Sequence, residues 1–320
     1  MDVVGAVMMA CLLGFGLGGL ARTGGELAFQ HQINSELREQ LPMPQWGTYQ
    51  PMSAKYPKHV MFSTRRKFRS KFESLTHHNA RMCALNLSRT NLLLFEQDNP
   101  KIRKNFYGFV FLKDMFLEAQ RLVPDAATYT YFNDDLLFNQ SFIHTLDTVV
   151  LHSLMKRPYK GIRINKRFMV MGLRTNVNWT REAHSRMLQN PNGTLFVKSA
   201  QDYFACSRGM WDWSKLPDFV VGRVGYDNWL VENAVTAFPE VISVIDASLT
   251  NQVIHQTDPR VGDYQGHSMN RGPEYNVKLA GLYYPGVHYS EVVYPKGMIS
   301  SAPYSTTWGE NGTISIQWRD

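Results

Sequence analysis

Cysteine is scarce in this chain of 320 residues, which contains only Cys11, Cys83 and Cys206. Three cysteines exclude a framework of several disulfides and a zinc site built from several thiolates. Cys11 lies in an apolar segment. Cys83 and Cys206 either form one disulfide or remain two buried thiols, and the sequence leaves both alternatives open.

Charged residues are also few, because Asp, Glu, Lys and Arg together make up 19% of the chain. Basic residues number 34 and acidic residues 27, so the net charge is +7, which suits a phosphate-bearing ligand, a nucleic acid or a membrane surface. The chain contains no Walker loop, no zinc-finger spacing and no serine nucleophile elbow. Nucleic-acid binding is supported by net charge alone, and we expect no nucleic-acid partner.

Apolar residues, in contrast, are abundant at 44% of the chain, and aromatic residues reach 12%. This composition excludes a disordered chain, which would be poor in aromatic residues and rich in charge. A length of 320 residues allows one large domain or two ordinary ones, with a sizeable core.

The longest run without a charged residue covers residues 3–21 and is rich in glycine. As a helix it would be about 28 Å long, close to the hydrocarbon thickness of a bilayer. A signal anchor, a cleaved signal peptide and a buried helix are the alternatives, and we expect an anchor within residues 1–22. Five N-glycosylation sequons are consistent with a lumenal chain. They begin at Asn86, Asn139, Asn178, Asn192 and Asn311.

Residues 23–57 are polar and contain several prolines, which predicts a stem or linker. A folded domain is expected over 58–320. Its first part shows the order strand, helix, strand, helix, strand, which predicts an α/β fold with a mostly parallel central sheet flanked by helices. The predicted strands are 59–63, 92–95, 128–132, 168–172, 195–197, 219–221, 241–246 and 251–256, and the clearest helices are 108–122 and 227–237.

The strongest local signal is the acidic pair Asp134-Asp135, which follows Asn133 at the end of the strand predicted over 128–132. Two carboxylates at the end of a buried strand need a neutralising partner, and parallel α/β sheets bind ligands at that edge. Asp135, with Asp134 or Asn133, is therefore a candidate ligand for Mg²⁺ or Mn²⁺ bridging a diphosphate. The alternative is an ordinary turn in which one of the two acids caps the next helix.

A second signal is the loop bracketed by Gly222 and Gly225, which brings Asp227 to the start of an apolar helix. Asp227 is either a helix cap or a general base aimed into a cleft. Trp229 is a candidate platform for a sugar ring. Alternatively Tyr226 and Trp229, which share a helix face, are both core residues.

Three further residues are candidates for the same chemistry. Asp202 precedes two aromatic residues and is either a second site carboxylate or a surface acid. His255 is either a polar residue with ordinary partners or a ligand that completes a metal or diphosphate site. Arg65 opens a basic run, 65–71, which either steers a nucleotide diphosphate by its positive field or forms a solvated helix face.

Several segments, taken in order, resemble a poorly characterised group of glycosyltransferase-like proteins with the GT-A, nucleotide-diphospho-sugar transferase fold. The resemblance covers roughly residues 59 to 280, and its most specific parts are Asp227-Asn228-Trp229-Leu230 and His255-Gln256. The other segments are Val60-Met61-Phe62-Ser63-Thr64, Asn79-Ala80, Tyr131-Phe132-Asn133-Asp134-Asp135, Val170-Met171-Gly172-Leu173-Arg174-Thr175-Asn176, Gln201-Asp202-Tyr203-Phe204, Val221-Gly222-Arg223 and Asp246-Ala247-Ser248.

The resemblance implies a nucleotide-sugar donor and a metal held by an Asp-x-Asp-like motif, which reads Asn133-Asp134-Asp135 in this chain. It places the metal and diphosphate role at Asp135, with Asn133 in the first motif position. It also implies that Asp227 takes the place of the general base of inverting enzymes. The segment after His255-Gln256 reads Thr257-Asp258-Pro259-Arg260, where the group usually has a histidine-rich stretch.

We therefore expect residues 58–320 to be a GT-A-like catalytic domain that moves a sugar from a nucleotide-diphosphate donor to an acceptor hydroxyl, assisted by Mn²⁺ or Mg²⁺. Residues 3–21 would anchor it in the membrane of the Golgi or another secretory compartment, with the catalytic domain in the lumen, or it would be secreted if the N-terminus is cleaved. A non-catalytic sugar- or nucleotide-binding protein on the same fold is the alternative. A nucleotidyltransferase is a third possibility, because fold alone does not set the reaction.

Overall fold

The computed structural model describes residues 58–65, 71–96, 98–178, 193–257, 272–281 and 296–319. They all belong to a compact unit that runs from Pro42 to Asp320. The predicted anchor and stem therefore lie outside the described residues. No helix in the described ranges is both long enough and apolar enough to cross a membrane.

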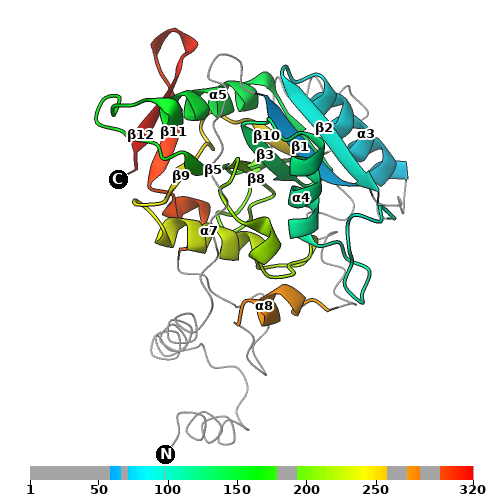
Figure 1. Cartoon of the computed structure of the whole chain (residues 1–320). Helices are drawn as coiled ribbons and strands as arrows, with labels where there is room; N and C mark the ends of the chain where they lie inside the picture. The colour runs from blue at the N-terminus through cyan, green and yellow to red at the C-terminus, as the bar shows by residue number, and fades with distance from the viewer. Residues whose placement is uncertain are drawn as a thin grey trace, which may run out of the picture. The chain divides into compact units, whose positions relative to one another are not determined.

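The main feature is an eight-stranded sheet with the order β12-β11-β9-β5-β8-β3-β1-β2 (Figure 1). Six of these strands run in one direction, because β8 is antiparallel to both of its neighbours, β3 and β5, and β12 is antiparallel to β11. The strands are β1 (His59–Arg65), β2 (Thr90–Glu96), β3 (Thr128–Phe132), β5 (Arg167–Met171), β8 (Tyr203–Ser207), β9 (Ile242–Asp246), β11 (Tyr304–Trp308) and β12 (Ile314–Trp318).

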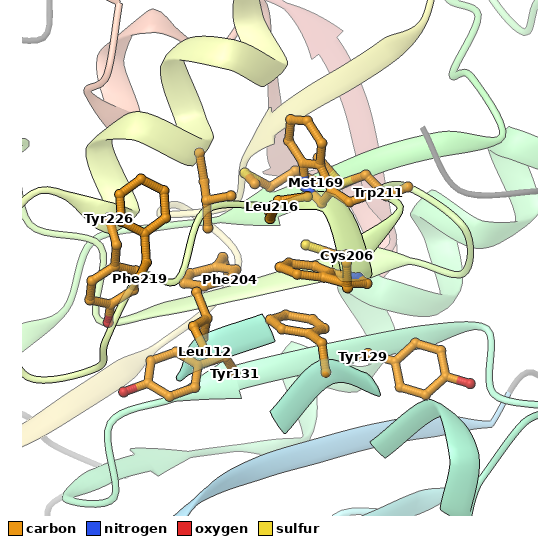
Figure 2. Packing of buried hydrophobic residues seen from close by; sticks show 14 of the residues in the cluster. Leu112, Tyr129, Tyr131, Met169, Phe204, Cys206, Trp211, Leu216, Phe219 and Tyr226 are labelled. Atoms are coloured by element: carbon orange, nitrogen blue, oxygen red, sulfur yellow. The ribbon is translucent and has the colours of Figure 1, made fainter. Parts of the chain in front are cut away.

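Helices cover both faces of this sheet (Figure 1). On one face α5 (Gln140–Leu154) packs through Phe142, Leu146 and Val150. On the other face lie α4 (Leu112–Leu122) and α7 (Tyr226–Thr236), and Figure 2 shows part of their aromatic core. The central strand β3 is buried along its whole length, and all five of its residues are β-branched or aromatic, the types that pack well in a strand. The predicted α/β fold with a mostly parallel, helix-flanked sheet is thus confirmed.

A second, four-stranded sheet has the order β4-β10-β6-β7. The helix α3 (Lys71–Leu85) packs on it, with Ala80 and Cys83 against Leu137, Val177 and Ile254. The small sheet consists of β4 (Leu136–Phe138), β6 (Thr175–Asn178), β7 (Thr194–Leu195) and β10 (Val253–Thr257). The other elements in the described ranges are the short helix α8 (Tyr275–Leu279) and the 3₁₀ turns η1 (Trp213–Lys215), η4 (Ile299–Ser301) and η5 (Glu310–Gly312).

Some predicted elements differ from the structure. Residues 219–221 form no strand, because Val220 makes only an isolated bridge to Phe111 and its backbone is otherwise held by Asn276. The helix predicted from residue 108 begins at Leu112, since residues 104–110 turn back on themselves. The hairpin of β11 and β12 was not predicted.

The two described cysteines are separate buried thiols. Cys83 packs between α3 and the small sheet, whereas Cys206 lies in the core beneath α4 and α7. Burial raises the pKa of Cys83 to about 12 and also raises that of Cys206. Of the two alternatives drawn from the sequence, the structure therefore contains the unpaired thiols.

Candidate functional site

The carboxyl ends of β3 and β5 lie on either side of the amino end of the antiparallel strand β8. Asn133 follows β3, Arg174 follows β5, and Asp202 immediately precedes β8. The reversal of strand direction therefore brings side chains from three distant segments to one edge of the sheet. In open α/β sheets this edge is where ligands bind.

Asp202 is the centre of a buried hydrogen-bond network at this edge. Its Oδ1 lies 2.6 Å from a guanidinium nitrogen of Arg174 and accepts a 2.6 Å hydrogen bond from Nδ2 of Asn133. Both charged side chains are nearly withdrawn from solvent, with 7% of Arg174 and 13% of Asp202 exposed. Burial raises the pKa of Asp202, and the positive charge of Arg174 opposes that rise.

Asp134 and Asp135 each face a histidine from a different element. Nδ1 of His77, on α3, lies 2.7 Å from Oδ2 of Asp134, and Nε2 of His255, on β10, lies 3.3 Å from Oδ2 of Asp135. Burial by itself would raise the pKa of Asp135. The charges of His255, Arg174 and His77 outweigh burial and hold this pKa below its usual range. Asp135 is therefore a carboxylate at neutral pH.

Gln256 fixes the backbone of the acidic pair. Its Nε2 donates to the carbonyl oxygens of Asp135, at 3.1 Å, and of Thr76, at 2.9 Å. Its Oε1 accepts a hydrogen bond of 3.0 Å from Nδ2 of Asn79. The side chain is buried, so these bonds join α3, β10 and the acidic loop in a water-poor environment, where they position the carboxylates firmly.

Asp227 lies in the first turn of α7, next to the same network. The residue that caps the start of the helix is Gly225, whose φ of 100° is in the left-handed region that favours glycine. Oδ2 of Asp227 accepts a hydrogen bond of 3.3 Å from the backbone N–H of Gln201, the residue before Asp202. Burial raises the pKa of Asp227 to about 6. The pKa of Asp227 is thus close to the value that suits a general base at neutral pH.

Trp229 and Tyr226 are core residues, which is the alternative left open by the sequence. Trp229 is 6% exposed and packs edge-on against Phe219, at a ring distance of 5.1 Å. Tyr226 contacts Tyr131 and Phe204 in the cluster drawn in Figure 2. A buried indole cannot serve as a platform for a sugar ring, so the structure does not bring Trp229 to the site.

Arg65 is the last residue of β1 and pairs in register with Glu96 of β2. Its side chain and residues 66–70 lie outside what the structure describes, so the predicted role in steering a diphosphate stays a prediction. Asp258, Pro259 and Arg260, which belong to the segment after His255-Gln256, also lie outside the described residues.

The site contains carboxylate oxygens that suit a hard divalent cation. Oδ1 of Asp135 and Oδ2 of Asp202 are buried and accept no hydrogen bond within the described part of the chain. No group of three or more His, Cys, Asp and Glu side chains in that part forms a ready metal cage. Mg²⁺ and Mn²⁺ sites often use one or two carboxylates and complete their coordination with substrate phosphates, and the residues here fit that kind of site.

Three residues of the network were missed as site residues in the sequence. Arg174 follows a predicted strand, so the rule that parallel strands end at one edge could have pointed to it. In the sequence, Gln256 stands out only as part of a resembling segment. His77 had no signal at all, because a histidine on a helix is usually an ordinary polar residue.

No protein-family model matches the chain, and no curated protein matches it.

Proposed function

We propose that this protein is a glycosyltransferase of the GT-A type, which moves a sugar from a nucleotide-diphosphate donor to an acceptor hydroxyl. The observation that carries the proposal is the pair of buried carboxylate oxygens, on Asp135 and Asp202, that find no hydrogen-bond partner among the described residues. Both lie at the edge of the mostly parallel sheet where ligands bind in such folds. Leaving such atoms unsatisfied is unfavourable, and a cation shared with a diphosphate would satisfy both.

Asp135 and Asp202 would hold Mn²⁺ or Mg²⁺. When bound, the cation supplies charge neutralisation for the departing nucleoside diphosphate. Asp135 suits this role because its low pKa keeps it ionised. Arg174, fixed by Asp202 and by a 3.0 Å hydrogen bond from its Nε to Oδ1 of Asn176, would add a second positive charge toward the diphosphate.

Asp227 would act as the general base. In the proposed step the acceptor oxygen forms a bond to the anomeric carbon while the bond from that carbon to the diphosphate oxygen breaks. The nucleoside diphosphate leaves with the electron pair, and the hydroxyl proton passes to Asp227. With its pKa raised to about 6, Asp227 is mostly ionised at pH 7 and still basic enough to accept a proton.

The GT-A assignment and the secretory location are parts of the same proposal. The mostly parallel sheet, with the acidic motif directly after β3, supports a nucleotide-binding edge. The uncharged run of residues 3–21 and the sequons support a chain anchored in a Golgi or other secretory membrane, with residues 58–320 in the lumen.

A non-catalytic sugar- or nucleotide-binding protein is the second candidate, and one observation favours it. Arg174 already supplies a positive charge to Asp202, and the His77 ring nitrogen lies 2.7 Å from Asp134. A network with such internal partners can be stable without a cation, and it would still present Arg174 to a phosphate.

The test is nucleoside-diphosphate release by the purified full-length chain from a panel of UDP- and GDP-sugars, with and without Mn²⁺. We expect Asp135→Asn to lower the Mn²⁺-dependent rate by at least about 100-fold, because a ligand to the leaving-group cation is lost. The matched control is Asp125→Asn, an exposed acid paired with Lys58 at the other end of β3, which should keep the full rate.

Equal rates in the wild type and Asp135→Asn would remove Asp135 from the mechanism. Thermal-shift measurements with nucleoside diphosphates, combined with the turnover assay, separate the two candidates, because a ligand that binds the folded protein raises its melting temperature. Binding without any turnover would favour the non-catalytic protein. If the protein shows no binding and no turnover, both candidates are refuted.

A further inference from the structure

A groove of about 400 Å³ lies beside the carboxylate network but is built from different residues. Leu173 and Thr175, which flank Arg174 in the chain, line one side of it. The loop between β9 and β10 lines another side, through residues 248–252, and Trp308 at the end of β11 completes it. None of the carboxylates of the network lines the groove.

Among the described residues, none that lines this groove is charged, although the chain as a whole has a net charge of +7. Seven of its residues carry amide or hydroxyl groups, and the other four are three leucines and a tryptophan. Neutral donors and acceptors beside an exposed apolar surface suit a neutral polyol better than a phosphate or an acidic chain, which would select arginine and lysine.

Three apolar side chains at the groove are unusually exposed. Trp308 is 46% exposed, Leu249 68% and Leu195 65%. An exposed indole offers a flat apolar face and one N–H donor, which together match the C–H face and the hydroxyl edge of a sugar ring.

The groove also holds an unsatisfied polar group. Asn251 is 2% exposed, and its Oδ1 accepts no hydrogen bond within the described ranges, while its Nδ2 makes only a long contact of 3.5 Å to the hydroxyl of Tyr203. A buried carbonyl of this kind is unfavourable unless a donor reaches it. A ligand hydroxyl entering the groove would supply that donor.

We propose that this groove is a binding site for a neutral saccharide, separate from the carboxylate network. Trp308 would stack against the sugar ring, Leu249 would cover its apolar face, and Asn251 would accept a hydrogen bond from a hydroxyl. The site goes beyond the proposed transferase activity, because it needs neither a cation nor a nucleotide.

The test uses the purified full-length chain and three neutral probes: chitotriose, cellotriose and mannotriose. Saturation-transfer NMR detects contact, and calorimetric titration gives the affinity. We expect at least one probe to bind, and Trp308→Ala to weaken it about tenfold or more through loss of the stacking surface. Leu249→Glu should weaken it similarly, and this exposed substitution keeps the test valid if Trp308→Ala fails to fold.

Trp318→Ala is the matched control, because Trp318 lies on the other strand of the same hairpin, is 51% exposed and does not line the groove. It should bind the saccharide within about twofold of wild type, since no groove contact is lost. Asp135→Asn should also bind normally, which separates this site from the proposed transferase centre. No binding of any probe, or equal weakening by Trp318→Ala and Trp308→Ala, would overturn the proposal.

Discussion

Arg174 and Asp202 form a buried ion pair of 2.6 Å between the end of β5 and the start of β8. The carboxylate also accepts a hydrogen bond from Asn133, so β3, β5 and β8 are joined at one point by side chains. The pair therefore holds together the edge at which the candidate site lies, and the consequences for stability can be measured.

Replacing Arg174 by methionine removes the charge and keeps most of the volume. We expect a loss of about 3 kcal/mol in the free energy of unfolding, because Asp202 is left as a buried carboxylate without its cation. The double variant Arg174→Met with Asp202→Asn should recover much of this loss. Urea denaturation monitored by circular dichroism gives the values.

The control for this prediction is Lys58→Met. Lys58 pairs with Asp125 at 2.8 Å, but both side chains are more than half exposed, so solvent screens the interaction. We expect little change in stability. If Arg174→Met lowers the free energy of unfolding no more than Lys58→Met does, the Arg174–Asp202 pair does not stabilise the fold.

Asp227 should make the protein less stable as the pH rises through about 6. Its pKa is about 6 in the folded protein and near 4 in an unfolded chain, so between these values the folded state keeps a proton that the unfolded state has lost. The contribution of Asp227 to the free energy of unfolding is complete below pH 4 and disappears above pH 6. The contribution is at most about 3 kcal/mol.

Asp227→Asn removes this titration. Between pH 4 and pH 7 the variant should lose less stability than the wild type, as measured by urea midpoints at several pH values. Glu310→Gln changes an exposed acid in the β11–β12 turn and should leave the wild-type profile intact. Parallel profiles for the wild type and Asp227→Asn would contradict the raised pKa.

Phe116 is a strong candidate for a core residue on which folding depends. It is fully buried on α4, stacks on Trp213 at a ring distance of 3.5 Å and meets Phe62 edge-on at 4.7 Å. Phe116→Ala should lower the free energy of unfolding by about 3–5 kcal/mol through the cavity it leaves. Thermal denaturation would show the corresponding fall in melting temperature.

Phe106 provides the matched comparison, because it is 80% exposed. Phe106→Ala should change the stability by no more than about 0.5 kcal/mol. Similar melting temperatures for the two alanine variants would show that the packing around Phe116 is not as described.

Cys83 and Cys206 should be unreactive in the folded protein. Both thiols are buried, and burial raises the pKa of Cys83 to about 12, so almost no thiolate forms at neutral pH. Iodoacetamide should label neither residue under native conditions and both after denaturation, as read by peptide mass spectrometry. A peptide in which Cys83 is bridged to Cys206 would contradict this prediction.

Local sequence patterns are sufficient to predict the main strands of the sheet and the position of the acidic motif. Buried strands are rich in β-branched and aromatic residues, and the segment 128–132, followed by Asn133, Asp134 and Asp135, is such a run. The same local logic located Asp227 at a helix start. It could not settle whether Trp229 faced a ligand or the core, because helical spacing is the same in both cases.

Which side chains contact one another depends, in contrast, on the three-dimensional arrangement of the whole chain. His255 and Asp135 are 120 residues apart in the chain, Gln256 and Thr76 are 180 apart, and Asn133 and Asp202 are 69 apart. Their proximity depends on the crossover connections and on the antiparallel insertion of β8, and none of these leaves a local pattern. Hydrophobic periodicity records which face of an element is buried, whereas the partner across a sheet edge is chosen by the whole fold.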